Sequence, residues 1–159
     1  MRKIDQLLSE YGESHQNPTN KLIHWVCVPA IFFSVIGLIW SIPSGFLNQI
    51  TGVYSPFINW ATIVGVLALL YYFSLSKPLF MAMVFVMLVF FSLSNFIDQS
   101  ESLSLFLVSV SVFIISWIVQ FYGHKIEGKK PSFFKDVQFL LIGPLWLTHF
   151  IFKKLGLSY

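Results

Sequence analysis

Long apolar stretches dominate this chain and leave it few possible folds. They occupy residues 22–42, 57–75, 79–97 and 103–122, and each is almost free of charged side chains. About 20 helical residues cross the ~30 Å hydrocarbon core of a bilayer, so each stretch can span it as a helix. In lipid, every backbone polar group must be paired within its own segment or barrel, which excludes open sheets. The sequence therefore predicts an all-α integral membrane protein, a four-helix bundle forming a single domain over residues 1–159.

Composition supports this class and argues against two others. Hydrophobic residues make up 56% of the chain and charged residues only 11%, as expected where lipid covers apolar surface. The first 21 residues are polar and carry no early apolar stretch, so no cleavable secretory signal is expected. The net charge of +3 comes from residues that flank the apolar stretches and form no basic stripe. Nucleic acid is therefore not an expected partner.

The basic residues predict the orientation of the bundle. An even number of spans brings all of them to one face, whereas the opposite face carries Asp98 and Glu101 and no basic residue. Because Lys and Arg in short loops stay on the cytoplasmic side, both termini are predicted to be cytoplasmic. The ten basic residues are Arg2, Lys3, Lys21, Lys77, Lys125, Lys129, Lys130, Lys135, Lys153 and Lys154.

Two terminal segments fall outside the four predicted spans. Near the N-terminus, Ile4, Leu7, Leu8 and Tyr11 recur at helical spacing among polar residues, which predicts an amphipathic helix lying on the membrane. The C-terminal segment 137–152 is apolar but short, is interrupted by Gly143-Pro144 and is followed by two lysines. Length and charge both favour a re-entrant or interfacial helical segment there.

Four histidines are predicted to share the cytoplasmic side with the basic residues. His15, His24, His124 and His149 lie near the ends of apolar segments, and no other histidine occurs in the chain. Neutral imidazole is a common ligand for Fe, Zn and Cu, and ionisable groups near a membrane need a partner or a function. We therefore interpret the four as candidate ligands of one metal site, although a single interfacial histidine more often contacts a headgroup or the backbone.

Polar residues near these histidines are the other candidate site residues. Asn17-Pro18 is typical of a helix start, with Asn as the N-cap and Pro at the first helical position, and would put His15 just before the cap. Glu127 follows His124 by three residues and can share its helical face. It can equally pair with a nearby lysine, Lys125 or Lys130. The candidate catalytic residues are Asn20, Gln120 and Glu127.

Two blocks of sequence carry a family resemblance. The first runs from His15 to His24 as H-x-N-P-x-N-x-x-x-H, and the second from Gln120 to Pro131 as Q-F-x-G-H-x-x-E-x-x-x-P. In combination they resemble the membrane 2-hydroxy fatty acid dioxygenases of fungal phytosphingosine breakdown, over essentially the full chain. The resemblance implies Fe(II) as cofactor and an α-oxidation in which a 2-hydroxy fatty acid and O2 give the acid shortened by one carbon and CO2. It also implies that His15, His24 and His124 are metal-binding histidines.

The resemblance also sets the expected partners and location. They are a 2-hydroxy fatty acid, O2 and the lipid bilayer, with a homodimer left open, in a bacterial inner membrane or, in a eukaryote, the endoplasmic reticulum. The alternative is a non-catalytic membrane scaffold or lipid-binding protein whose histidines hold a structural metal such as Zn. A small transporter ranks lowest because the middle of each apolar stretch is almost wholly apolar.

Overall fold

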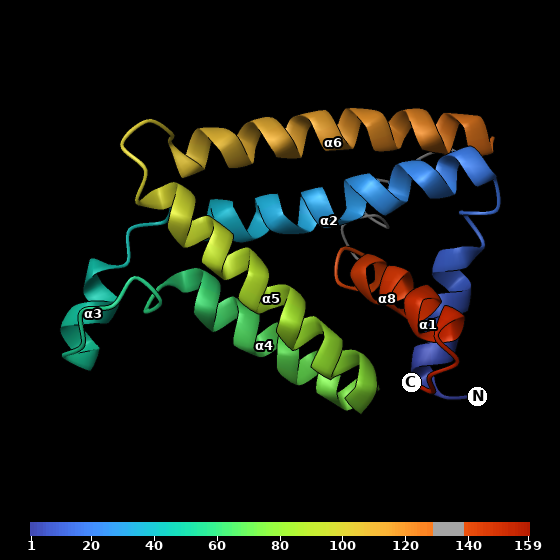
Figure 1. Ribbon diagram of the computed structural model, residues 1–159, viewed down its shortest axis with the longest axis horizontal. Helices are drawn as coiled ribbons and strands as arrows, with labels where there is room; N and C mark the ends of the chain where they lie inside the picture. The colour runs from blue at the N-terminus through green and yellow to red at the C-terminus, as the bar shows by residue number, and fades with distance from the viewer. Residues whose placement is uncertain (129–138) are drawn as a thin grey trace.

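The computed structural model describes residues 1–128 and 139–159, and these residues form helices and no strand. Figure 1 shows α2 and α6 lying side by side, α4 and α5 crossing them at an angle, and α1 with α8 at the end where both termini lie. The all-α class predicted from the sequence is confirmed. The seven described helices are α1 (Lys3–Gly12), α2 (Pro18–Trp40), α3 (Gly45–Thr51), α4 (Trp60–Leu75), α5 (Lys77–Asp98), α6 (Leu105–Glu127) and α8 (Ile142–Lys154).

Helices α2 and α6 form the most extensive pair in the structure, and they run antiparallel. Small residues let the two backbones approach. Ser34 of α2 and Ser109 of α6 are fully buried, and a Cβ on Gly37 would collide with Ser109 Oγ. Close approach through small residues is how helices associate in lipid, where burial of apolar side chains gives no driving force. This pair carries two of the four histidines.

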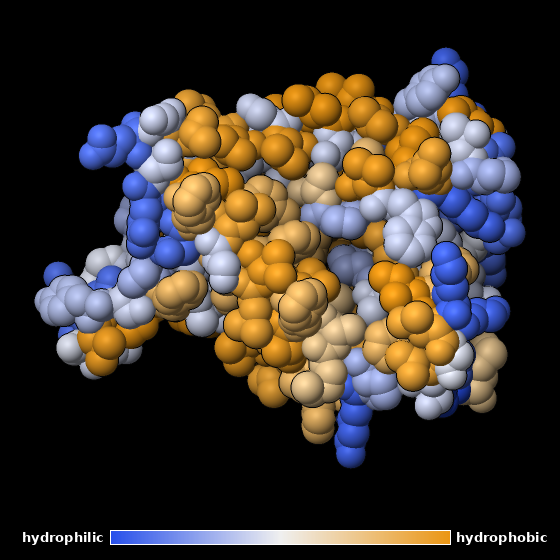
Figure 2. All heavy atoms as spheres, in the orientation of Figure 1, coloured by the Kyte–Doolittle hydropathy of each residue, from blue (hydrophilic) through white to orange (hydrophobic). Residues whose placement is uncertain are grey.

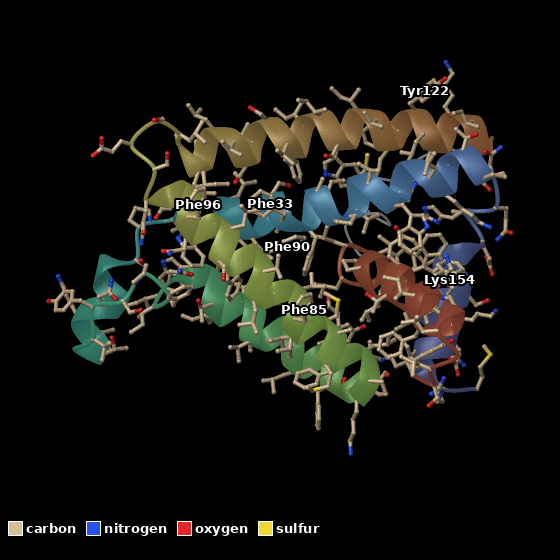
Figure 3. The ribbon with its side chains drawn as sticks, viewed as in Figure 1. Phe33, Phe85, Phe90, Phe96, Tyr122 and Lys154 are labelled. Carbon is tan, nitrogen blue, oxygen red and sulfur yellow. The ribbon has the colours of Figure 1, made fainter. Side chains whose placement is uncertain are left out.

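Helices α4 and α5 form a tight hairpin that packs on α2. Ser76 ends α4 and caps α5, because its Oγ accepts from Leu79 N at 3.3 Å. Phe33 of α2 and Phe90 of α5 meet edge to face with ring centroids 5.6 Å apart (Figure 3). Such pairs fill the space that the crossing angle leaves between helices.

Three helices, α2, α5 and α6, are long and apolar enough to cross a membrane. They correspond to the predicted spans 22–42, 79–97 and 103–122. The predicted span 57–75 is shorter than expected, because Asn59 caps α4 by accepting from Thr62 N at 3.0 Å and leaves a helix of 16 residues. Figure 2 shows apolar side chains over the middle of one face and hydrophilic ones at its two ends.

The terminal helices pack on each other at one end of the molecule. The amphipathic helix predicted at the N-terminus is present as α1, but its apolar side chains Ile4, Leu8 and Tyr11 are buried in the protein. The expectation that this face lies on the membrane is therefore wrong. Arg2 Nη1 donates a hydrogen bond to the main-chain oxygen of Tyr159, which joins the two ends of the chain.

The C-terminal apolar segment, predicted over 137–152, contains helix α8. Gly143-Pro144 lies in the first turn of this helix and does not interrupt it, in keeping with the tolerance of proline at helix starts. A Cβ on Gly143 would come within 3.0 Å of Val28 Cγ1, so glycine lets the start of α8 approach α2. Residues 137 and 138 lie outside the described part of the chain. The short helix α3 was not predicted.

Candidate metal centre

Three histidines from separate parts of the chain meet in the protein interior. His15 follows α1, His24 lies in α2 and His124 lies in α6, and their exposed fractions are 3%, 1% and 5%. One potential ligand atom from each lies within 4.8 Å of the other two. The ring centroids are 4.2 Å apart for His15 and His24, 5.0 Å for His24 and His124, and 5.4 Å for His15 and His124. We call these three residues the histidine cluster; they could hold a metal ion.

Backbone carbonyls determine which ring nitrogen of His15 and of His24 carries the lone pair. His15 Nδ1 lies 2.6 Å from Tyr11 O, and His24 Nδ1 lies 2.9 Å from Asn20 O. A carbonyl can only accept, so in each neutral ring Nδ1 carries the hydrogen and Nε2 carries the lone pair. Carbonyl partners of this kind fix the ring orientation of metal-binding histidines. The Tyr11 ring also stacks on the His15 ring, with centroids 4.4 Å apart.

The start of α2 is as the sequence predicted. Asn17 is the N-cap, and its Oδ1 accepts from Thr19 N at 2.9 Å and from Asn20 N at 3.3 Å, while Pro18 occupies the first helical position. This cap satisfies two backbone donors that would otherwise lack helical partners. Because α2 begins here, His24 lies about two turns inside the helix and His15 lies just before the cap.

Glu127 joins the end of α6 to the start of α2. Its Oε1 accepts from Gln16 N at 2.7 Å, and its Oε2 accepts from Asn17 N at 2.9 Å and Asn20 Nδ2 at 3.0 Å. Both carboxylate oxygens are therefore engaged by the segment that links His15 to His24. Within the described residues Glu127 forms no ion pair with Lys125, and Lys130 lies outside them. The geometry favours a positioning role over the lysine pairing considered from the sequence.

Asn20 is completely buried between α2 and α6. Its Nδ2 donates to Ser14 O at 3.1 Å as well as to Glu127, so one side chain links the loop after α1 to both helices. The close approach depends on Gly123, where a Cβ would lie 2.5 Å from Asn20 Oδ1. The glycine directly before His124 in the sequence is thus part of the geometry that brings His124 to His24.

A small cavity lies beside the histidine cluster. It has a volume of about 20 Å³ and is lined by His24 and Gln120, with Leu140 and Gly143 from the C-terminal part. A volume of ~10–15 Å³ is enough for one water-sized molecule. Gln120 is 6% exposed, so its amide is a buried polar group at the edge of this space. Gln120 is the candidate catalytic residue that lines the same cavity as a cluster histidine.

His149 lies apart from the other three histidines. It is partly buried in α8, its Nδ1 lies 3.2 Å from Trp146 O, and its ring contacts Phe150 and Tyr159 with centroids 4.6 and 5.2 Å away. Desolvation by burial is the main cause that lowers the pKa of His149 below its ordinary value. The group of potential ligands found among the described residues does not include it. The structure brings three of the four predicted ligands together.

Two aromatic residues support the cluster and were not proposed as site residues. Trp146 of α8 is 3% exposed, and its ring lies 5.3 Å from both the Tyr11 and the His15 rings. Tyr11 itself stacks on His15, although its helical spacing indicated only an apolar face. No sequence signal connects Trp146 to a histidine more than 100 residues earlier, because the contact depends on how α8 packs on α1.

Comparison with known proteins identifies the family of this chain. Residues 1–155 match the family described as 2-hydroxy-palmitic acid dioxygenase Mpo1-like. The chain is 32% identical over 152 residues to the 2-hydroxy-palmitic acid dioxygenase MPO1 of Saccharomyces cerevisiae, and the match covers 94% of this chain and 79% of the yeast protein. No solved structure matches. The chain therefore belongs to the Mpo1-like 2-hydroxy-palmitic acid dioxygenase family, which is a family of oxidoreductases.

Proposed function

We propose that this protein is an Fe(II)-dependent dioxygenase that converts a 2-hydroxy fatty acid to the fatty acid one carbon shorter, with release of CO2. Family membership supports the substrate class and the reaction type. The observation that carries the proposal is the cluster of three buried imidazoles, since one ring nitrogen of each lies within 4.8 Å of those of the other two.

The residues of the cluster fit an iron ion. His15, His24 and His124 would hold it through one nitrogen each, and Glu127 is not counted as a ligand because both of its oxygens already accept hydrogen bonds. Iron bound by three protein ligands keeps positions open, and it would supply a site where the 2-hydroxy acid and O2 are brought together. His149 lies outside the ligand set that we propose.

The overall reaction balances without a further reductant. The bond between C1 and C2 breaks, C1 leaves as CO2, and C2 is oxidised from an alcohol to the new carboxyl carbon. One O2 takes up the four electrons and supplies two oxygen atoms, and one water forms together with the shortened acid. A site with one metal and no second cofactor is therefore sufficient for this chemistry.

The other polar residues have distinct proposed roles. The carbonyls of Tyr11 and Asn20 contact Nδ1 of the His15 and His24 rings and so leave the lone pair on Nε2. Glu127 and the Asn20 side chain are positioning residues that hold the segment between His15 and His24 against α6. Gln120 is the residue that we expect to touch the substrate headgroup, because its amide can donate a hydrogen bond to a carboxylate from the cavity wall.

A location in the membrane explains how so small a chain could act on a fatty acid. We propose that α2, α4, α5 and α6 span the bilayer with both termini in the cytoplasm, and that α8 lies at the interface. The site would then meet the polar head of a fatty acid while its tail stays in an apolar environment. Each CH2 group left there avoids a transfer cost of about 0.8 kcal/mol into water.

Metal analysis and oxygen uptake of the purified protein test the proposal. We expect iron in the protein, and O2 consumption with 2-hydroxypalmitate that yields CO2 and pentadecanoic acid. Palmitate, which lacks the 2-hydroxyl group, is the matched substrate control and should not be consumed. Zinc in place of iron, with no turnover after iron loading, would instead support the scaffold alternative.

A further inference from the structure

A larger apolar space adjoins the small cavity that His24 lines. This groove has a volume of about 310 Å³ and lies between α2 and α4, where apolar residues line it throughout. Its volume lies within the ~300–1,000 Å³ range of small-molecule sites. Leu140 lines both this groove and the small cavity that contains His24 and Gln120. The groove and the cavity beside His24 therefore share one lining residue.

One face of α2 leads from the cavity into the groove. Val28 lines the cavity, and Phe32, Val35 and Ile39 line the groove. These residues are spaced four, three and four apart, which places them on the same helical face. The 11 residue steps from Val28 to Ile39 rise by about 16 Å, which is most of the length of an extended palmitoyl chain.

The opposite wall of the groove gives it a near end and a far end. Helix α4 runs back toward the site, and Tyr72 near its end donates a hydrogen bond to Leu141 O at 3.0 Å. Ala68 therefore lies nearer the cavity, whereas Ala61 lies nearer Ile39 at the far end. Both alanines line the groove and are nearly buried. Small side chains on this wall leave the space that a larger residue would fill.

We propose that this groove between α2 and α4 holds the alkyl tail of the substrate and that its far end, at Ile39 and Ala61, sets the chain-length preference. The inference rests on the proposed function, since it assigns the tail of the same 2-hydroxy fatty acid whose head would lie at the histidine cluster. The continuous apolar face from Val28 to Ile39 and the shared residue Leu140 carry it.

A second apolar groove provides an internal control. It has a volume of about 220 Å³ and lies between α2, α5 and α8, where Phe85, Val89 and Phe90 line it (Figure 3 labels both phenylalanines). It shares Phe32 with the proposed tail groove but no lining residue with the cavity beside His24.

Matched tryptophan substitutions in the two grooves test the proposal. Val64 lines the proposed tail groove and Val89 lines the control groove, and both side chains are 45% exposed. For Val64→Trp we expect kcat/KM with 2-hydroxypalmitate to fall about fourfold for each methylene displaced, with 2-hydroxyoctanoate little affected. For Val89→Trp both substrates should behave as in the wild type. Equal losses for both substrates in Val64→Trp, or equal effects of the two variants, would overturn the proposal.

A graded pair of substitutions locates the end of the tail. Ala61→Leu should shift the preferred substrate to shorter chains, whereas Ala68→Leu, nearer the site, should reduce turnover of long and medium chains alike. Iron content of each variant shows whether the fold is retained. If the Ala61→Leu protein retains iron and the wild-type chain-length profile, the far end of the groove does not set the chain-length preference.

Photolabelling separates a failure of this inference from a failure of the proposed function. The wild-type protein in lipid vesicles is labelled with a 2-hydroxypalmitate analogue that carries a diazirine at its far end. Label in peptides containing Ile39 or Ala61 supports the groove even if no turnover is found. Label confined to peptides containing Val89 or Phe85 overturns it, even if the enzyme activity is confirmed.

Discussion

His24 and His149 are both histidines in apolar helices, yet the fold gives them different surroundings. His24 is 1% exposed, its Nδ1 is held by a carbonyl one turn earlier, and two other histidine rings lie within 5.0 Å. His149 is only partly buried, and its ring contacts Phe150 and the C-terminal Tyr159. His24 belongs to a group of side chains that could hold an ion. His149 lies on α8, and its ring contacts the C-terminal residue Tyr159.

The polar network around Asn20 and Glu127 accounts for much of this difference. Glu127 holds the segment between His15 and His24 against the end of α6, and Gly123 leaves space for Asn20 between the two helices. In the described part of the chain, the contacts of His149 are with Trp146 O and with the Phe150 and Tyr159 rings, and they include no such side-chain network. Buried hydrogen bonds that fix a histidine ring beside other histidine rings are what prepare it to bind a metal. Counting the histidines on one side of a membrane does not reveal such hydrogen bonds.

The largest expected effect comes from truncating a ring of the histidine cluster. In His24→Ala, one of three ligands is lost from a buried site, so both iron content and turnover of 2-hydroxypalmitate should fall to background. His124→Ala should behave alike. Metal analysis and oxygen uptake measure these effects, and retained helical circular dichroism shows that the variant is folded. Full iron and full activity in either variant would remove that residue from the site.

A smaller effect is expected from Glu127→Gln, which keeps the size of the side chain but removes its charge. The amide can accept at only one atom, and its NH2 group would face backbone N–H donors that now contact the carboxylate. Loss of such supporting partners typically weakens metal affinity ~10–100-fold. Iron affinity from competition with a chelator is the measurement, and Glu101→Gln, at an exposed residue, is the matched control. Equal affinities of the two variants would show that the contacts of Glu127 do not support the site.

Gly123→Ala tests the helix approach without touching a polar group directly. The added Cβ would meet Asn20 Oδ1 at 2.5 Å, and Asn20 cannot move without losing its bonds to Ser14 and Glu127. Overpacking of this kind costs about 1–3 kcal/mol, which thermal unfolding of the iron-loaded protein should report. Gly45→Ala is the control, because nothing lies within 4 Å of its Cβ position. A Gly123→Ala protein as stable as Gly45→Ala would mean that the two helices tolerate a wider separation.

The smallest effect is expected from His149→Ala. This side chain contacts aromatic rings at the C-terminus and lies outside the cluster, so iron content and turnover should stay at the wild-type level, with at most a small loss of thermal stability. Loss of iron in this variant would show that α8 brings a fourth ligand to the ion and would overturn the distinction between the two regions.

Local features of the fold were readable from the sequence, and long-range ones were not. The helix start at Asn17-Pro18 was predicted because the capping side chain and the proline both act within a few residues. The helix class and three long spans followed from apolar length. The apolar span 103–122 covers only part of α6, but the spacing of His124 and Glu127 predicted a shared helical face, and α6 does continue to Glu127, with Gly128 as its left-handed C-cap at φ 74°.

For the candidate site, the sequence indicated which residue types are involved but not which of these residues the fold brings close together. It singled out His15, His24 and His124 by motif, and the structure groups these three. It grouped His149 with them only because all four histidines were predicted on the same side of the membrane. That prediction contains no information on how α8 packs on α1. It placed Tyr11 on a membrane-facing surface, whereas α1 turns that face inward and Tyr11 stacks on His15. Tertiary packing decides these contacts.

Anomalous scattering at the iron edge, from a crystal of the iron-loaded protein, tests the central claim most directly. The account predicts a single peak within coordination distance of Nε2 of His15 and of His24 and of a ring nitrogen of His124, with His149 not coordinating. A peak bound by His149, or an iron-loaded active protein with its peak away from the cluster, would contradict it.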